Sequence, residues 1–246
     1  MKWALGSAGW SLLSSCLSRR PLIALDFDGT LAPIVSQPDR AALPGSTRHL
    51  LQTLALRYTC VVLSGRARSD VKSRLAGIAL AEIIGNHGSE PWIDVKPLRK
   101  WTAQVLPSLR QRLAEIPGVE IEDKAASISV HYRRAFQRRH AMDATSAAAI
   151  DLRAGAVIPG KYVISLLPPD ALHKGQGLLR ALDAFGCSHA LFLGDDATDE
   201  PAFALAAEQR VLGIRVGYRA ASAACLYLKN QSEVDLLLHR ILSARS

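Results

Sequence analysis

Two aspartates lie two positions apart in the segment Asp26-Phe27-Asp28-Gly29-Thr30, directly after the apolar run of residues 22–25. A short apolar run of this kind predicts a strand that is buried on both faces of a parallel sheet. In open α/β sheets, ligands bind at the carboxyl ends of the strands. A carboxylate placed there can attack a phosphorus atom, while a second one protonates the leaving oxygen and then activates water. An ordinary acidic loop after a strand fits this spacing equally well.

Three more polar groups follow or begin core elements that we expect further along the chain. Ser64 comes after the apolar run of residues 59–63, and Lys174 begins an expected helix. The segment 194–200 reads Gly-Asp-Asp-Ala-Thr-Asp-Glu and holds four carboxylates. Because clustered carboxylates repel one another and offer hard oxygen ligands, this segment suits Mg²⁺. Taken alone, Ser64 also fits a helix cap, Lys174 a solvated surface lysine and Glu200 a helix-capping acid.

The hydrophobic pattern around these groups alternates between strands and helices. It predicts strands over residues 21–26, 59–63, 81–84, 190–193 and 211–216, and helices over 46–57, 69–75, 174–185 and 199–207. Strands that alternate with helices form a doubly wound parallel sheet. The sequence therefore predicts an α/β protein with a Rossmann-like core.

The pattern changes in the middle of the chain. Helices are expected over residues 98–116 and 134–152, and strands over 119–122, 127–132 and 162–167. Strands that follow one another between helices are typical of an α+β unit. We expect residues 1–95 and 169–246 to form the core, with residues 96–168 as an inserted domain.

Composition places the chain among ordinary globular proteins, with 246 residues, 49% hydrophobic and 21% charged. The net charge is +8, and residues 98–167 hold 11 Lys or Arg against 6 Asp or Glu. Four cysteines without short spacings predict free thiols in a reducing compartment. We interpret residues 1–18 as a cytoplasmic leader, because Gly and Ser interrupt its apolar runs.

Two classes of partner are excluded on sequence grounds. No apolar run reaches the roughly 20 residues of a membrane-spanning helix, so we expect a cytoplasmic protein with no membrane partner. The pairs Arg133-Arg134 and Arg138-Arg139 lack an accompanying aromatic platform or nucleic-acid module, so we expect no nucleic acid partner.

Together the motifs resemble those of a known superfamily. The Asp-x-Asp-Gly-Thr segment, Ser64, Lys174 and the acidic segment 194–200 occur in the order found in haloacid dehalogenase-like phosphatases. More specific segments resemble the trehalose-6-phosphate phosphatase family, and the resemblance spans about residues 21–217. These are Ser64-Gly65-Arg66, Gly85-Asn86-His87-Gly88-Ser89-Glu90, Glu122-Asp123-Lys124 and His131-Tyr132-Arg133. The resemblance implies a haloacid dehalogenase-type core with an inserted α+β cap domain that closes over a sugar phosphate.

The resemblance also implies a role for each matching residue. Asp26 would be the nucleophile and Asp28 the general acid and base, while Ser64 and Lys174 hold the phosphate. Mg²⁺ would be bound by Asp26, the Asp28 carbonyl and Asp195, with Asp199 supporting the metal site. The substrate-binding residues would be Ser64, Arg66, Asn86, Glu90, Glu122, Lys124 and Arg133. We leave His87 and His131 outside the catalytic set, since a histidine in a strand is more often structural.

One departure from the family pattern affects the expected substrate. Ser165 stands where the family commonly has a cap glutamate. The first hypothesis is a Mg²⁺-dependent phosphatase that acts on trehalose 6-phosphate through a phospho-Asp26 intermediate. The alternative is a phosphatase acting on another phosphorylated sugar or sugar-glycerol conjugate. A non-catalytic subunit of a trehalose-synthesis complex would have decayed catalytic loops, whereas Asp26, Asp28, Lys174 and Asp195 are all present. We expect a monomer.

Overall fold

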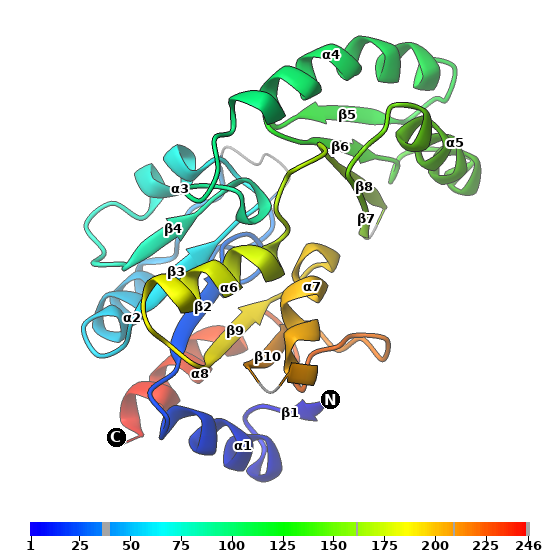
Figure 1. The fold of residues 1–246 in the computed structure, drawn as a ribbon. Coiled ribbons are helices and arrows are strands. Elements are labelled where there is room, and N and C mark those ends of the chain that lie inside the picture. Colours follow the sequence, from blue (N-terminus) through cyan, green and yellow to red (C-terminus); the bar gives the residue numbers. More distant parts are fainter. Residues whose placement is uncertain (36–39, 161, 209, 245–246) are drawn as a thin grey trace. The chain divides into compact units, whose positions relative to one another are not determined.

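The computed structural model describes residues 1–35, 40–160, 162–208 and 210–244. It divides into two compact units, shown in Figure 1: Met1–Gly88 with His173–Ser246, called the core unit, and Ser89–Leu172, called the inserted unit. The chain thus enters and leaves the inserted unit at residues 88–89 and 172–173, whereas the predicted insertion is 96–168.

A seven-stranded sheet in the order β1-β11-β10-β9-β2-β3-β4 forms the centre of the core unit. Each neighbouring pair of its strands is parallel. The strands are β1 (Lys2–Trp3), β2 (Leu22–Asp26), β3 (Cys60–Leu63), β4 (Glu82–Ile84), β9 (Ala190–Gly194), β10 (Val211–Val216) and β11 (Leu226–Leu228). Every residue of β2, β3 and β9 is buried, as expected for strands covered on both faces.

Helices cover both faces of this sheet (Figure 1). The helices are α1 (Ser7–Leu17), α2 (Gly45–Ala55), α3 (Arg68–Arg74), α6 (Lys174–Ala184), α7 (Glu200–Phe203) and α8 (Glu233–Ser243), with short 3-10 helices η2 (Asn86–Gly88), η3 (Ala197–Asp199) and η4 (Ala204–Glu208). Leu13 of α1, Leu51 of α2 and Leu237 of α8 share one apolar cluster with alternate residues of the strands. On the other face Phe203 of α7 packs on Phe192 of β9, with ring centroids 5.3 Å apart.

The inserted unit is built on a separate antiparallel sheet of four strands in the order β5-β6-β8-β7. Its elements are α4 (Lys96–Leu113), β5 (Glu120–Asp123), β6 (Ile128–His131), α5 (Arg138–Asp151), β7 (Ala156–Gly160) and β8 (Val163–Leu167). Alternate strand residues such as Val130 and Leu166 pack with Leu109 of α4 and Ala148 of α5. Because side chains alternate along a strand, Ser129 and Ser165 lie on the opposite face of the sheet.

The prediction of a leader at residues 1–18 is wrong. β1 pairs with β11 at the edge of the core sheet, and α1 buries Leu13 completely. Gly9 lets α1 approach β1 closely, since a Cβ there would collide with the backbone of Trp3. Gly9 therefore serves close packing, while Ser11 and Ser15 lie on the exposed side of α1. Both residue types interrupt the apolar runs, and they concealed the helix.

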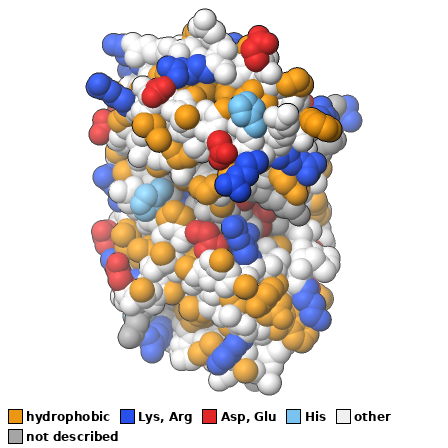
Figure 2. Space-filling view, turned by 90° about the vertical axis from the view of Figure 1, so that its right-hand side faces the viewer, with side chains coloured by type: hydrophobic (Ala, Val, Ile, Leu, Met, Phe, Trp, Pro, Cys, Tyr) orange, Lys and Arg blue, Asp and Glu red, His pale blue; other side chains and the backbone are white. Residues whose placement is uncertain are grey.

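Several other elements differ from the sequence prediction. β7, β11 and α8 were not predicted, and the helix expected over residues 199–207 is broken into η3, α7 and η4. No helix in the described part of the chain is both long and apolar enough to cross a membrane. On the face shown in Figure 2, basic side chains are spread among acidic and apolar ones.

Candidate active site

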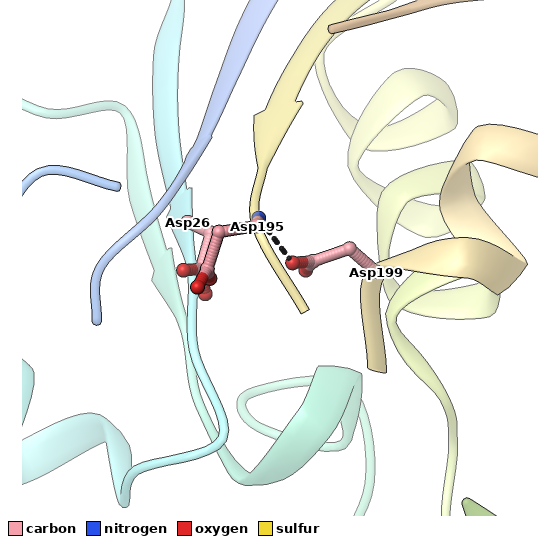
Figure 3. A group of neighbouring side chains, drawn as sticks. All are labelled: Asp26, Asp195 and Asp199. Atoms are coloured by element: carbon pink, nitrogen blue, oxygen red, sulfur yellow. Dashed lines mark hydrogen bonds between the residues drawn. The ribbon is translucent and has the colours of Figure 1, made fainter. Parts of the chain in front are cut away.

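Three aspartates meet at the carboxyl ends of the neighbouring strands β2 and β9. Asp26 is the last residue of β2, Asp195 follows β9 directly, and Asp199 ends η3. Each offers a carboxylate oxygen, and these oxygens lie within 4.8 Å of one another (Figure 3). Asp26 and Asp199 are buried, and Asp195 is partly buried. The group supplies only oxygen atoms, which is the ligand type that hard divalent cations prefer.

Lys174 lies against this group at the start of α6. Its ammonium group donates hydrogen bonds to Asp26 Oδ1 and to Asp199 Oδ1, both at 2.6 Å. The lysine is only 2% exposed, so the alternative of a solvated surface lysine is excluded. A buried ammonium group between two carboxylates forms charge-assisted hydrogen bonds in a setting where little water screens them.

Asp199 also orders the acidic loop. Its Oδ2 atom accepts hydrogen bonds from the backbone N–H groups of Asp195 and Asp196, each at 2.9 Å. Two glycines allow the acids to come so close. A Cβ at Gly29, which has φ +82°, would collide with the Asp195 carboxylate, and a Cβ at Gly194 would lie 2.5 Å from Asp199 Cγ. Glycine at both positions is therefore a requirement of the site geometry.

Burial, together with neighbouring charges, raises the pKa values of two of these acids. Burial raises the pKa of Asp26 to about 8, although Lys174 opposes the shift. Burial and the neighbouring Asp26 raise the pKa of Asp195 to about 9. Burial alone would lower the pKa of Lys174, but Asp199 and Asp26 raise it above its ordinary value. Lys174 is thus fixed as a cation, and further positive charge at this group would favour the ionised forms of Asp26 and Asp195.

Ser64 and Asp28 lie near the same edge of the core sheet. Ser64 follows β3, is fully buried, and accepts a hydrogen bond from the Arg66 backbone N–H at 3.1 Å. Its own hydroxyl hydrogen can be donated to a ligand. The Asp28 carboxylate accepts two hydrogen bonds from the Arg66 guanidinium, at 2.7 and 2.8 Å.

Asn86 is a buried residue of η2 with φ +47°. Its backbone N–H donates to the Arg66 carbonyl oxygen at 2.7 Å, which ties this turn to the end of β3. His87, which we left outside the catalytic set, is buried beside it. The core unit therefore holds eight of the predicted site residues close to strand ends or loops of one sheet: Asp26, Asp28, Ser64, Arg66, Asn86, Lys174, Asp195 and Asp199.

The remaining predicted residues, Glu90, Glu122, Lys124 and Arg133, belong to the inserted unit. Lys124 Nζ lies 3.7 Å from Glu122 Oε2, so these two side chains form an ion pair. His131 Nε2 also lies 2.9 Å from Glu122 Oε2. The Arg133 guanidinium stacks over the Tyr162 ring at 6.0 Å.

Ser165, at the position of the family's cap glutamate, lies in the middle of β8. Its hydroxyl is 3.3 Å from that of Ser129 on the paired strand β6, and both residues are buried. The two hydroxyl groups therefore hydrogen-bond to each other within the sheet of the inserted unit.

Sequence reasoning missed Asp70, which accepts a hydrogen bond from Arg66 Nη1 at 3.0 Å and another from Arg74 Nε at 2.9 Å. A signal was present for Arg74, because residues four apart on a helix face each other and both Asp70 and Arg74 lie in α3. Arg66 precedes this helix, so its contact with Asp70 had no such signal. Sequence reasoning also missed Arg215, a buried residue that donates to Glu200 at 2.9 Å.

Comparisons with known proteins agree on one family. A family model described as trehalose-phosphatase matches residues 24–225. The trehalose-phosphate phosphatase of Mycobacterium tuberculosis (strain ATCC 25618 / H37Rv) is 37% identical over 209 residues, which cover 78% of this chain and 53% of that protein. The chain thus spans about half the length of this curated relative.

Solved structures share the fold at lower identity. The C-terminal domain of C. albicans trehalose-6-phosphate phosphatase matches with a TM-score of 0.76 and 22% identity, covering 96% of this chain and 97% of that one. The sucrose-phosphatase of Synechocystis sp. PCC6803, solved with sucrose and phosphate, matches with a TM-score of 0.54 and 17% identity, covering 80% and 83%. The predicted fold class, a haloacid dehalogenase-type α/β core with an inserted α+β unit, is confirmed.

Proposed function

Because the chain belongs to the trehalose-phosphatase family, we propose that it hydrolyses trehalose 6-phosphate to trehalose and phosphate. The observation that carries the proposal is the buried group of Asp26, Lys174, Asp195 and Asp199. Acids and a fixed ammonium group at the end of a parallel strand suit phosphoryl transfer, where catalysis consists largely of positioning and charge stabilisation.

In the proposed reaction an Asp26 carboxylate oxygen attacks the phosphorus atom in line with the sugar oxygen. The bond between phosphorus and that oxygen breaks, and Asp28 donates the proton that converts the leaving oxygen into a hydroxyl group. Asp28, now a carboxylate, takes a proton from water, and this water attacks the phospho-Asp26 group. Phosphate leaves, Asp26 is regenerated as a carboxylate, and Asp28 again carries a proton.

Lys174 and Ser64 would hold the phosphoryl oxygens during both steps. The ammonium group of Lys174 is already fixed by Asp26 and Asp199, so little rotational freedom is lost when the phosphoryl group binds. Ser64 contributes its hydroxyl hydrogen from a fully buried position. Both groups are in place before substrate arrives, which is the condition for effective electrostatic stabilisation.

Mg²⁺ fits the donor set of this site. Asp26, Asp195 and the Asp28 carbonyl oxygen would hold it, and Asp199 would support the loop that carries Asp195. When bound, the ion offsets negative charge on the phosphoryl oxygens and on the three carboxyl groups. Burial raises the pKa values of Asp26 and Asp195, and a bound cation would oppose this shift.

The sugar would be bound by polar and charged side chains. Those predicted to do so are Asn86 of the core unit and Glu90, Glu122, Lys124 and Arg133 of the inserted unit. Arg66, which the resemblance also assigns to the substrate, donates to Asp28 and Asp70. The ion pair of Glu122 and Lys124 offers both acceptors and donors to sugar hydroxyls. We keep the cytoplasmic location and the monomeric state as predictions.

A second candidate substrate is another phosphorylated sugar or a sugar-glycerol conjugate. Ser165 favours it, because a hydroxyl already paired with Ser129 cannot make the two-acceptor contact of a carboxylate. In a Ser165→Glu variant, lower activity on trehalose 6-phosphate would support this candidate, and higher activity would oppose it.

The test is phosphate release in the presence of Mg²⁺ from trehalose 6-phosphate, sucrose 6-phosphate, glucose 6-phosphate and a glucosylglycerol phosphate. Asp26→Asn is the blank, since it removes the nucleophile with little change of volume. A preference for trehalose 6-phosphate supports the proposed substrate. Equal or faster release from another compound refutes the substrate and keeps the chemistry, while no release from any of them favours a non-catalytic role.

A further inference from the structure

The Arg66 guanidinium and the Asp28 carboxylate are joined by two hydrogen bonds. Arg66 Nε donates to Asp28 Oδ2 at 2.7 Å, and Nη2 donates to Asp28 Oδ1 at 2.8 Å. Two parallel hydrogen bonds of this kind fix the orientation of a carboxylate as well as its distance. The Asp28 side chain is 40% exposed, so without this partner it would have much rotational freedom.

Arg66 is itself held from the other side. Its Nη1 atom donates to Asp70 Oδ2 at 3.0 Å, and Arg74 binds the other oxygen of Asp70 at 2.9 Å. The guanidinium also lies over the Phe27 ring at 5.8 Å, and the Arg66 side chain is only 14% exposed. The position of Asp28 is therefore tied to α3 through a chain of charged contacts.

These contacts leave Arg66 poorly suited to the phosphate-binding role that a basic residue in this loop suggests. Each of its three guanidinium nitrogens donates to a carboxylate oxygen of Asp28 or Asp70. A phosphoryl group bound in the same two-fold manner, through Nε and Nη2, would have to displace the Asp28 carboxylate.

We infer that Arg66 is a positioning residue that orients Asp28 for proton transfer to the leaving sugar oxygen. The inference rests on the proposed function, because it assigns Asp28 the acid and base role. The two-fold contact with Arg66 fixes the direction in which the Asp28 oxygens point while the proton passes to the leaving oxygen. The same orientation then serves the second step, in which Asp28 receives a proton from water.

A test follows from the leaving group. A sugar alkoxide needs a proton to leave, whereas p-nitrophenolate leaves without one because its phenol is far more acidic. The quantity to compare is kcat/KM, which reports the steps up to departure of the leaving group. Because a positioned general acid typically contributes about 10²–10⁴-fold, Arg66→Gln should lower kcat/KM on trehalose 6-phosphate by about 10²-fold. On p-nitrophenyl phosphate it should change little, and the inhibition constant of inorganic phosphate should stay close to the parent value.

Two controls separate orientation from general damage. Arg74→Gln removes the second arginine on Asp70 without touching Asp28, so it should leave the ratio of the two kcat/KM values unchanged. Adding Arg66→Gln to Asp28→Asn should cause no further loss on trehalose 6-phosphate, because the group to be oriented is already gone. Arg66→Lys keeps the positive charge but cannot form the two parallel hydrogen bonds to Asp28. It should therefore show the same loss of kcat/KM on trehalose 6-phosphate alone.

Two results would overturn the inference: an equal fall of kcat/KM on both substrates, or weaker inhibition by inorganic phosphate in Arg66→Gln. Either would make Arg66 a ligand of the phosphoryl group. If Arg66→Gln does not fold, Arg66→Lys decides by the same comparison. Failure of the proposed function is distinct, because the parent enzyme would then release p-nitrophenol but no phosphate from trehalose 6-phosphate. The comparison is then made with whichever sugar phosphate the parent hydrolyses.

Discussion

Removing one carboxylate from the acidic group should change how the stability of the metal-free protein depends on pH. The perturbation is Asp195→Asn. In the folded protein, burial and the nearby Asp26 raise the pKa of Asp195 from 3.8 to about 9. A carboxyl group with a raised pKa contributes stability that is fully present below its unfolded pKa and is lost as the pH rises through its folded pKa. The parent protein should therefore lose stability from about pH 4 towards pH 9.

The size of the effect follows from the shift. A carboxyl that titrates in the unfolded state but stays protonated in the folded state costs about 1.4 kcal/mol of stability per pH unit. Between pH 5 and 8 Asp195 would contribute a loss of up to about 4 kcal/mol, and less where Asp26 shares the proton. The free energy of unfolding of Asp195→Asn should fall less steeply over this range than that of the parent.

The assay is urea unfolding followed by circular dichroism at several pH values, in buffer with EDTA. Groups common to both proteins cancel in the comparison of slopes. Asp196→Asn is the matched control, because it changes the neighbouring aspartate outside the group of three carboxylates and should change the slope less. Equal slopes for the parent and Asp195→Asn would refute the argument that burial holds the Asp195 carboxyl protonated.

Three further variants test other contacts of the site. Lys174→Met leaves two buried carboxylates without their ammonium partner, so the free energy of unfolding at pH 8, measured by urea titration, should fall by about 3–5 kcal/mol. A fall of less than about 1 kcal/mol would contradict a stabilising role of the two buried ion pairs. Gly29→Ala, at φ +82° and against the Asp195 carboxylate, should cost about 1–3 kcal/mol and lower Mg²⁺ affinity in calorimetry, and unchanged affinity would argue against the tight approach. Asp26→Asn should keep the circular dichroism spectrum and lose more than about 10³-fold in phosphate release, and near-parental turnover would exclude the covalent route.

The parts of the fold that the sequence predicts best are those governed by one strong pattern. β2, β3 and β9 are continuous apolar runs, and each is followed by polar residues of the site. The parts that were missed depend on contacts between distant segments. β1 and β11 are only two and three residues long and exist because each pairs with a neighbouring strand. Such short strands carry no periodicity of their own.

In the candidate site, too, the features set by a local sequence pattern were predicted and those set by contacts between distant segments were not. The spacing of Asp26 and Asp28, together with the acidic segment after β9, predicts a shared strand edge, and the structure brings Asp26 and Asp195 together there. The burial of Lys174 could not be predicted from its neighbours, because it results from two carboxylates that are distant in sequence. The contact of Arg66 with Asp28, 38 positions away, likewise depends on the pairing of β2 with β3.

The most direct test of the central claim is to look for phosphate on Asp26. In Asp28→Asn, p-nitrophenyl phosphate can phosphorylate Asp26 without an acid, while hydrolysis of phospho-Asp26 lacks its base. Rapid mixing with Mg²⁺ should give a burst of p-nitrophenol equal to the enzyme concentration, and mass spectrometry of the quenched protein should place one phosphoryl group on Asp26. Steady product release without a burst, or a label on any other residue, would contradict the account.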